Sequence, residues 1–291
     1  MQLLISRYVE ENKRYLYDSI KEKLNDNKIV YLIVPEQFTL GTEIEAFEAL
    51  QINSTFNLKI KSFTKLANEI IHQAGGRSLN FISDQAKYLM VQSILLDHKN
   101  DLKVFQNNTE DKEFIELLIR LMDQFADNNL DEVGLREIVK KMGDDSELGK
   151  KLEDINLISS EYRKLLAQSS YSTKDKSQIA IEKISQMDAF KDAAFYFYRF
   201  HDMSNKELEM VKSINAISDF SFVSLILDKR LILGDKRLVK DADVFDISLN
   251  FYRGLRETIE DIEIINPAPI KDQSDVEILL ANMFRLSLIH I

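Results

Sequence analysis

The amino-acid sequence predicts an α/β protein whose parallel sheet is interrupted by an all-helical segment. Short apolar runs alternate with helical periodicity before residue 80, strand signals vanish between residues 83 and 187, and the alternation returns near residue 193. Strand–helix units in series favour a parallel sheet with right-handed crossovers. We therefore expect a discontinuous α/β domain over residues 1–80 and 190–285 and a helical insertion over residues 81–189.

The first α/β segment contains three apolar runs with the length of strands that helices cover on both faces: residues 3–6, 29–34 and 55–60. Apolar side chains at helical spacing predict helices over residues 10–25 and 63–72. Thr42 with Glu45 is a candidate capping box for a further helix, and Ser62 is a candidate N-cap.

The middle segment carries three apolar faces with helical spacing, at residues 86–94, 114–125 and 152–166. After it, strands are expected at residues 193–198, 220–227, 244–247 and 262–265. Helices are expected from 204 to 214, from 248 to 257 and from 275 to 284. Ser204 and Glu207 form a second candidate capping box, which opens the first of these helices.

The composition excludes several classes of protein. The chain has no cysteine, which excludes a disulfide scaffold, a thiolate zinc site and a cysteine-ligated iron–sulfur cluster within it. The formal net charge of −10 argues against strong DNA binding by this chain alone, because a free-standing nucleic-acid binder usually has a basic surface. The apolar runs are too short to cross a bilayer, and no secretory signal opens the chain, so we expect a cytoplasmic protein.

A strand, a loop and a helix at the N-terminus stand where the phosphate loop of a RecA-like P-loop NTPase would lie. Such a loop needs glycines, a Lys for the β- and γ-phosphates and a Ser or Thr for Mg²⁺. Residues 6–14 contain no glycine, and Glu10 and Glu11 would face the anion. Lys13 stands at the position of the phosphate-binding lysine, but Arg14 stands where the loop needs the Ser or Thr hydroxyl group. Lys13 is therefore the one nucleotide-binding candidate, at a degenerate site.

The strand at residues 193–198 should supply the other half of an ATPase, a carboxylate for Mg²⁺ and a Glu that activates water. Tyr198 and Arg199 occupy those two positions, and neither side chain can serve. Because both halves are missing, we expect no catalytic residue and no ATP or Mg²⁺ cofactor in this chain. The four histidines show no metal-ligand spacing, so no metal site is expected either.

Several segments resemble a known family. The run Val34-Pro35-Glu36-Gln37-Phe38-Thr39 and the run Lys61-Ser62-Phe63-Thr64-Lys65-Leu66-Ala67 resemble the N-terminal region of the B subunit of AddAB/RexAB helicase–nucleases. Residues 151–158, with Tyr162, look like the helical segment of that family. Residues 197–204 are similar to its strand-to-helix junction. The matches follow the expected order along most of the chain, and residues 286–291 read as a tail outside it.

The resemblance implies a superfamily-1-like helicase frame in a subunit that does not act as the motor. It also implies an AddA/RexA-type partner that carries the active helicase, and work on DNA ends in recombinational repair. Members of the family continue into a nuclease domain with an iron–sulfur cluster, and this chain has neither. A helical scaffold without a role in DNA binding and a divergent ATPase are the alternative interpretations.

Side chains at the expected carboxyl edge of the sheet are the candidates for contact with DNA or a partner: Gln37, Thr39, Lys61, Ser62, Phe63, Thr64 and Lys65. Open α/β folds bind ligands at that edge. Each candidate also has a structural interpretation. Gln37 and Thr39 can start and cap a helix, Ser62 can cap the next one, and the lysines can form a solvated surface.

Overall fold

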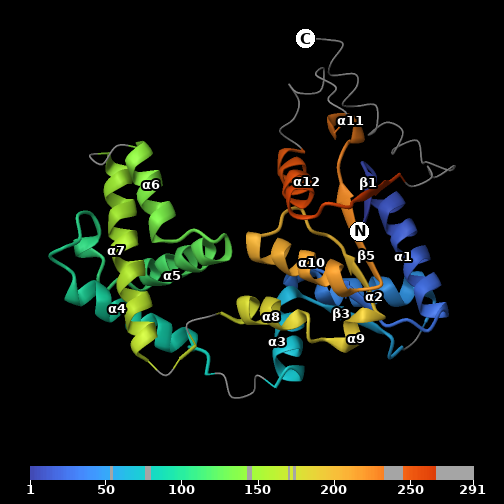
Figure 1. Cartoon of the computed structure of the whole chain (residues 1–291). Helices are drawn as coiled ribbons and strands as arrows, with labels where there is room; N and C mark the ends of the chain where they lie inside the picture. The colour runs from blue at the N-terminus through green and yellow to red at the C-terminus, as the bar shows by residue number, and fades with distance from the viewer. Residues whose placement is uncertain are drawn as a thin grey trace, which may run out of the picture.

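The computed structural model describes residues 1–52, 55–75, 80–142, 146–169, 171–172, 175–232 and 245–266. Figure 1 shows an α/β part, which contains both ends of the described chain, and a helical part beside it. The helical part lies between the third and fourth strands in the sequence.

The sheet has six strands, and all their pairings are parallel: β1 (Gln2–Ser6), β2 (Val30–Ile33), β3 (Leu58–Lys61), β4 (Ala194–Phe197), β5 (Phe220–Ile226) and β6 (Glu263–Ile265). Their order in the sheet is β3-β2-β4-β5-β1-β6. From β2 the chain passes to β3 on one side, and from β4 it passes to β5 on the other. The gap between β2 and β4 is therefore a topological switch point.

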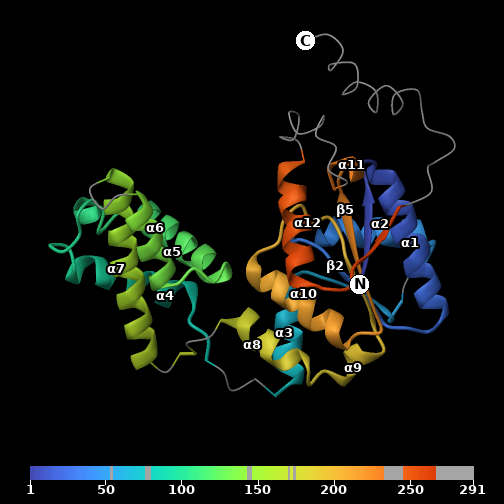
Figure 2. The ribbon, with the colours of Figure 1, turned by 45° about the horizontal axis from the view of Figure 1, so that its top comes forward.

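Helices cover both faces of this sheet (Figure 2). One face is covered by α1 (Val9–Asn25) and by α2 (Thr39–Leu50), which follows the short helix η1 (Glu36–Phe38). The helices of the other face are α3 (Phe63–Gln73), α8 (Lys176–Ile184), α9 (Asp188–Lys191), α10 (Asn205–Ile217) and α12 (Asp246–Thr258). The short helix α11 (Lys229–Ile232) follows β5.

Alternation along the strands divides the core between these two faces. In β2, Tyr31 and Ile33 pack with α3 and α10, whereas Val30 and Leu32 pack with α1 and α2. All four are fully buried, so the strand reads as a continuous apolar run. Tyr31 stacks on Phe195 of β4 with ring centroids 4.7 Å apart, an arrangement that adds about 0.5–1.5 kcal/mol beyond burial of the two rings.

The helical part has a core of its own. The helical part comprises α4 (Asp84–Asp97), η3 (Phe105–Asn107), α5 (Lys112–Asp127), α6 (Glu132–Met142) and α7 (Glu147–Gln168). No described residue between β3 and β4 forms a strand. The buried Asp154 of α7 accepts hydrogen bonds from three consecutive backbone N–H groups, at residues 103–105. By contrast, Ala180 and Ile184 of α8 belong to the core beneath the sheet.

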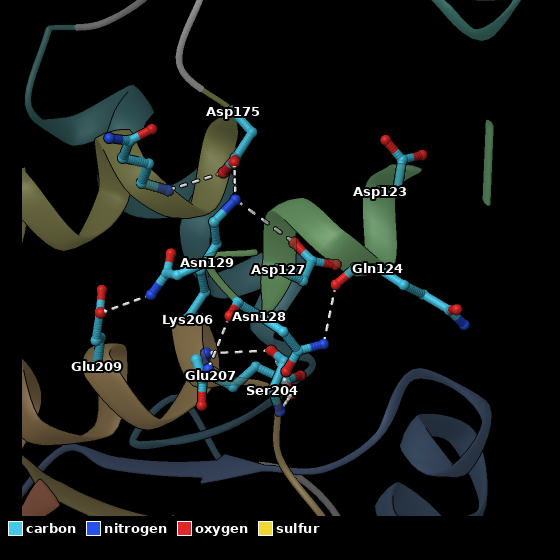
Figure 3. Close-up of polar contacts among 12 residues, drawn as sticks. Asp123, Gln124, Asp127, Asn128, Asn129, Asp175, Ser204, Lys206, Glu207 and Glu209 are labelled. Atoms are coloured by element: carbon cyan, nitrogen blue, oxygen red, sulfur yellow. Dashed lines mark hydrogen bonds and ion pairs between the residues drawn. The ribbon is translucent and has the colours of Figure 1, made fainter. Parts of the chain in front are cut away.

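A polar junction joins the end of α5 to the start of α10 (Figure 3). The ammonium of Lys206, which is buried, forms ion pairs with Asp127 of α5 and with Asp175, the N-cap of α8. The amide of Asn129 donates to the Glu209 carboxylate, and the amide of Asn205 donates to the carbonyl of Asn128. Burial raises the pKa of Asp127, Lys206 lowers it, and Asp175 raises it further, for a net rise.

Most expected elements are observed within three residues of their predicted ends. Ser62 caps α3, and Ser204 with Glu207 forms a complete capping box on α10. The capping box expected at Thr42 and Glu45 is wrong. The helix begins three residues earlier, at Thr39, because η1 leads directly into it, and the Thr39 hydroxyl donates to the Glu36 carbonyl.

Two further expectations are wrong, and two others lie outside the residues that the structure describes. A strand was expected at residues 244–247, but residues 246 and 247 form the start of the helix α12, and residue 244 lies outside the described residues. The apolar faces expected at residues 86–94 and 114–125 included Leu89 and Leu117, which are exposed, and omitted Ile115, which is buried on α5. The helix expected at residues 275–284 and the tail at residues 286–291 lie outside the described residues.

Candidate functional site

A pocket of about 370 Å³ opens at the carboxyl edge of the sheet. Its walls are the segments that follow β2, β3 and β4, namely residues 34–38, 62–64 and 199–202, together with Glu207. It therefore lies at the switch point between β2 and β4, the position where open parallel sheets bind ligands.

Four of the sequence-derived candidates line this pocket, and they differ in exposure. Gln37 and Thr64 are exposed and can meet a ligand. Ser62 and Phe63 are buried: Ser62 caps α3 and donates to the Glu36 carboxylate at 2.5 Å, and Phe63 stacks on Phe197. Thr39 is also buried and does not line the pocket. The ligand-facing surface thus combines Gln37 and Thr64 with groups that follow β4.

Neither Lys61 nor Lys65 lines the pocket. The Lys61 ammonium lies 2.8 Å from a carboxylate oxygen of Glu69, and Lys59 lies 3.5 Å from the other oxygen. Burial raises the pKa of Glu69, but hydrogen bonds and charge from Lys61 and then Lys59 outweigh it and hold that pKa below its usual range. Lys65 is exposed on α3.

Arg199 is the pocket residue whose conformation the sequence does not reveal. Its φ of 65° lies in the left-handed region, which non-glycine residues seldom adopt and which stores strain when they do. Its guanidinium lies 5.4 Å from the ring centroid of Phe38 and donates to Glu45 at 2.7 Å. The one sequence signal was the presence of Arg where an ATPase carries a carboxylate. The other pocket residues that follow β4 include His201 and Asp202, both exposed.

The connection between β1 and α1 differs from a phosphate loop in length and shape. Arg7 and Tyr8 are the only residues between the strand and the helix, so α1 begins four residues before Lys13. A phosphate loop keeps its backbone non-helical until the Lys, because consecutive N–H groups must turn toward the anion. Here the Glu11 carboxylate accepts from the Ser6 hydroxyl at 2.5 Å, at the start of the helix.

Lys13 lies in the second turn of α1, and its ammonium is 3.4 Å from the Glu45 carboxylate. Glu45 also bonds Arg199, so Lys13 and Arg199, assigned from opposite halves of a nucleotide site, meet at one carboxylate. Among the described residues, no group of three or more His, Cys, Asp or Glu side chains could hold a metal ion. Within the same residues, no helix is both long and apolar enough to span a membrane.

The parallel sheet covered on both faces, with its pocket at a switch point, defines an open α/β protein of the Rossmann/RecA-like class. The family described as "ADDB, N-terminal" matches residues 3–277, and the chain belongs to that family.

Curated relatives are named as the B subunit of an ATP-dependent helicase/deoxyribonuclease. The protein of Clostridium botulinum (strain Langeland) is 26% identical over 297 residues, which cover 98% of this chain and 25% of the relative. The protein of Bacillus mycoides (strain KBAB4) is 24% identical over 264 residues, which cover 88% of this chain and 22% of the relative. The chain therefore spans about a quarter of the length of these relatives.

Proposed function

We propose that this chain is the N-terminal, helicase-like part of the B subunit of an AddAB/RexAB-type helicase–nuclease, which processes double-strand DNA ends for recombinational repair. Family membership and the names of the relatives support this role. In the proposal, residues 1–80 and 190–285 form a RecA-like domain, and residues 81–189 form a helical insertion. An AddA/RexA-type motor subunit is the partner, and the complex works in the cytoplasm.

The chain does not hydrolyse ATP in this proposal. Three features support that inference: the two-residue connection before α1, the acidic residues Glu10 and Glu11 in its first turn, and the Arg199 side chain after β4. Because phosphate binding at a helix N-terminus relies on free N–H groups and positive potential, acidic side chains there oppose it. These features weigh against the divergent ATPase.

The pocket at the switch point holds single-stranded DNA in this proposal, and its position is the observation that carries the idea. Gln37 offers an amide to a base edge, and the Phe38 ring offers a face for stacking. Glu36, Asp202 and Glu207 also line the pocket, so it is poorly suited to follow a phosphate backbone by charge. We infer that the chain contacts bases and that the motor subunit supplies most contacts to phosphate.

The DNA test measures fluorescence anisotropy of a labelled single-stranded oligonucleotide with the full chain, alone and together with the motor subunit. Replacing Gln37 and Thr64 together by Ala is expected to weaken binding about tenfold, in the range that single base contacts contribute. Gln124→Ala, an exposed amide on α5, is the control and should leave the affinity unchanged. Equal affinities for the double variant and the wild type would reject the pocket as the DNA site.

The nucleotide test is calorimetry with ATP and Mg²⁺. We expect no heat of binding from the isolated chain. A saturable binding isotherm that Lys13→Ala abolishes would support the divergent ATPase instead, because Lys13 is the one residue in register with a phosphate-binding lysine.

A further inference from the structure

The Glu45 carboxylate of α2 is the meeting point of four donors, two from α1 and two from the segment that follows β4. Its Oε2 atom lies 3.4 Å from Nζ of Lys13 and 2.7 Å from Nη2 of Arg199. Its Oε1 atom accepts from the hydroxyl groups of Tyr17 at 2.9 Å and Tyr198 at 3.2 Å. Cations thus bind one oxygen and phenols the other, and the Glu45 side chain is only 15% exposed.

Both phenols are held as donors. Burial, and then the charge of Glu45, raise the pKa of Tyr17 well above its usual range. Burial and Glu45 likewise raise the pKa of Tyr198, to about 12. Two cations and two phenolic O–H groups that converge on one point form an environment built for an anion, because charge-assisted hydrogen bonds to oxygen atoms are strong.

We propose that Lys13, Arg199, Tyr17 and Tyr198 form a latent binding site for a phosphate-class oxyanion, which the chain's own Glu45 carboxylate keeps filled. The two cations come from the segments where a nucleotide site would have its phosphate lysine and its metal-binding carboxylate. Glu45 supplies from α2 the negative charge that a phosphate group would bring. The inference concerns the anion cluster and does not depend on whether the neighbouring pocket binds DNA.

Filling the site in this way has a structural effect on the pocket. Arg199 lines the pocket in a strained conformation, and Glu45 holds its guanidinium next to the Phe38 ring. Because the Glu45 carboxylate is always present, it holds Arg199 in this position whether or not a nucleotide is bound. Lys13 and Arg199 remain about a third exposed, so an external anion can reach them once the carboxylate is removed.

The test is calorimetry with inorganic pyrophosphate and, in a second arm, with ATP and Mg²⁺. Glu45→Ala is expected to bind pyrophosphate at least about tenfold more tightly than the wild type, since a negative charge is removed from between two cations. Glu45→Gln keeps the size of the side chain and an acceptor for the phenols, and it should show a gain of the same sign. The control is Glu48→Gln, an exposed carboxylate on the same helix, which should show none.

The proposal also predicts that adding Lys13→Ala to either variant abolishes the gain. A folded Glu45→Gln protein that binds pyrophosphate no better than the wild type overturns the proposal and leaves Glu45 as a structural ion pair. A gain that survives Lys13→Ala also overturns it, because the anion would then bind elsewhere. Gain with pyrophosphate but not with ATP would define an anion site without a nucleotide pocket. None of these results bears on oligonucleotide affinity, so failure here is distinct from failure of the proposed function.

Discussion

Replacing Lys206 by Met removes the cation that joins the helical part to the α/β part (Figure 3). The Lys206 side chain is 9% exposed, whereas its partners Asp127 and Asp175 are 49% and 43% exposed. Breaking a fully buried ion pair costs about 3–5 kcal/mol, and an exposed pair contributes about 0–1 kcal/mol. With one partner buried and two half-exposed, we expect a loss of about 1–2 kcal/mol, because two carboxylates remain without their shared cation.

For a chain of 291 residues that loss corresponds to a fall in Tm of about 2–3 °C. Differential scanning fluorimetry measures it, and Lys212→Met, an exposed lysine on the same helix, is the control. The Met side chain retains most of the apolar stem, so the difference between the variants reports the charge. An unchanged Tm for Lys206→Met, or an equal fall for Lys212→Met, would refute the reasoning.

Three further changes probe the core and two half-buried carboxylates. Phe195→Ala should destabilise the protein by about 3–5 kcal/mol in urea denaturation, whereas Phe56→Ala, at a ring that is 98% exposed, should not. Burial raises the folded-state pKa of Glu207, so its contribution to stability is present at acidic pH and lost as pH rises through that value. Glu207→Gln, which can still complete the capping box, should therefore gain stability relative to the wild type between acidic and neutral pH. Lys61 and Lys59 lower the folded-state pKa of Glu69 despite its burial. The contribution of Glu69 to folding stability is therefore present at neutral pH and lost on acidification. Glu69→Gln should be less stable than the wild type at neutral pH, and the difference should vanish in acid. Urea denaturation as a function of pH checks both, and curves parallel to that of the wild type would contradict them.

Local patterns in the sequence were sufficient to predict all six strands of the sheet and the caps of two of its helices. The run at residues 29–34 is apolar at every position, and in the structure it is a central strand with helices on both sides. Ser62 and Ser204 were found as caps because a cap depends on residues only three positions apart. The strand order is a non-local property, and it was not predicted.

Thr42 and Glu45 show where a local rule fails. Their spacing satisfies the capping-box pattern, but Glu45 bonds Arg199, which is 154 residues away in the sequence. No local pattern reveals a contact of that range, nor the left-handed backbone of Arg199. The candidates at Ser62 and Phe63 were predicted at the right edge of the sheet, but not that both are buried: Phe63 stacks on Phe197 of β4, and Ser62 bonds the Glu36 carboxylate.

Strand β3 is one of the two edge strands of the sheet, and this position gives its lysines a significance apart from nucleic acid. An unpaired strand edge is a template for pairing with another chain, and proteins discourage this with charged side chains, lysine above all. Lys59 and Lys61 are two of the four residues of β3, and Glu69 holds both ammonium groups close to that strand. Their apolar replacement would expose a short edge of β-branched and aliphatic character beside the pocket. Lys61, one of the candidates for DNA contact, and its strand neighbour Lys59 thus place charge at a sheet edge that is open to pairing.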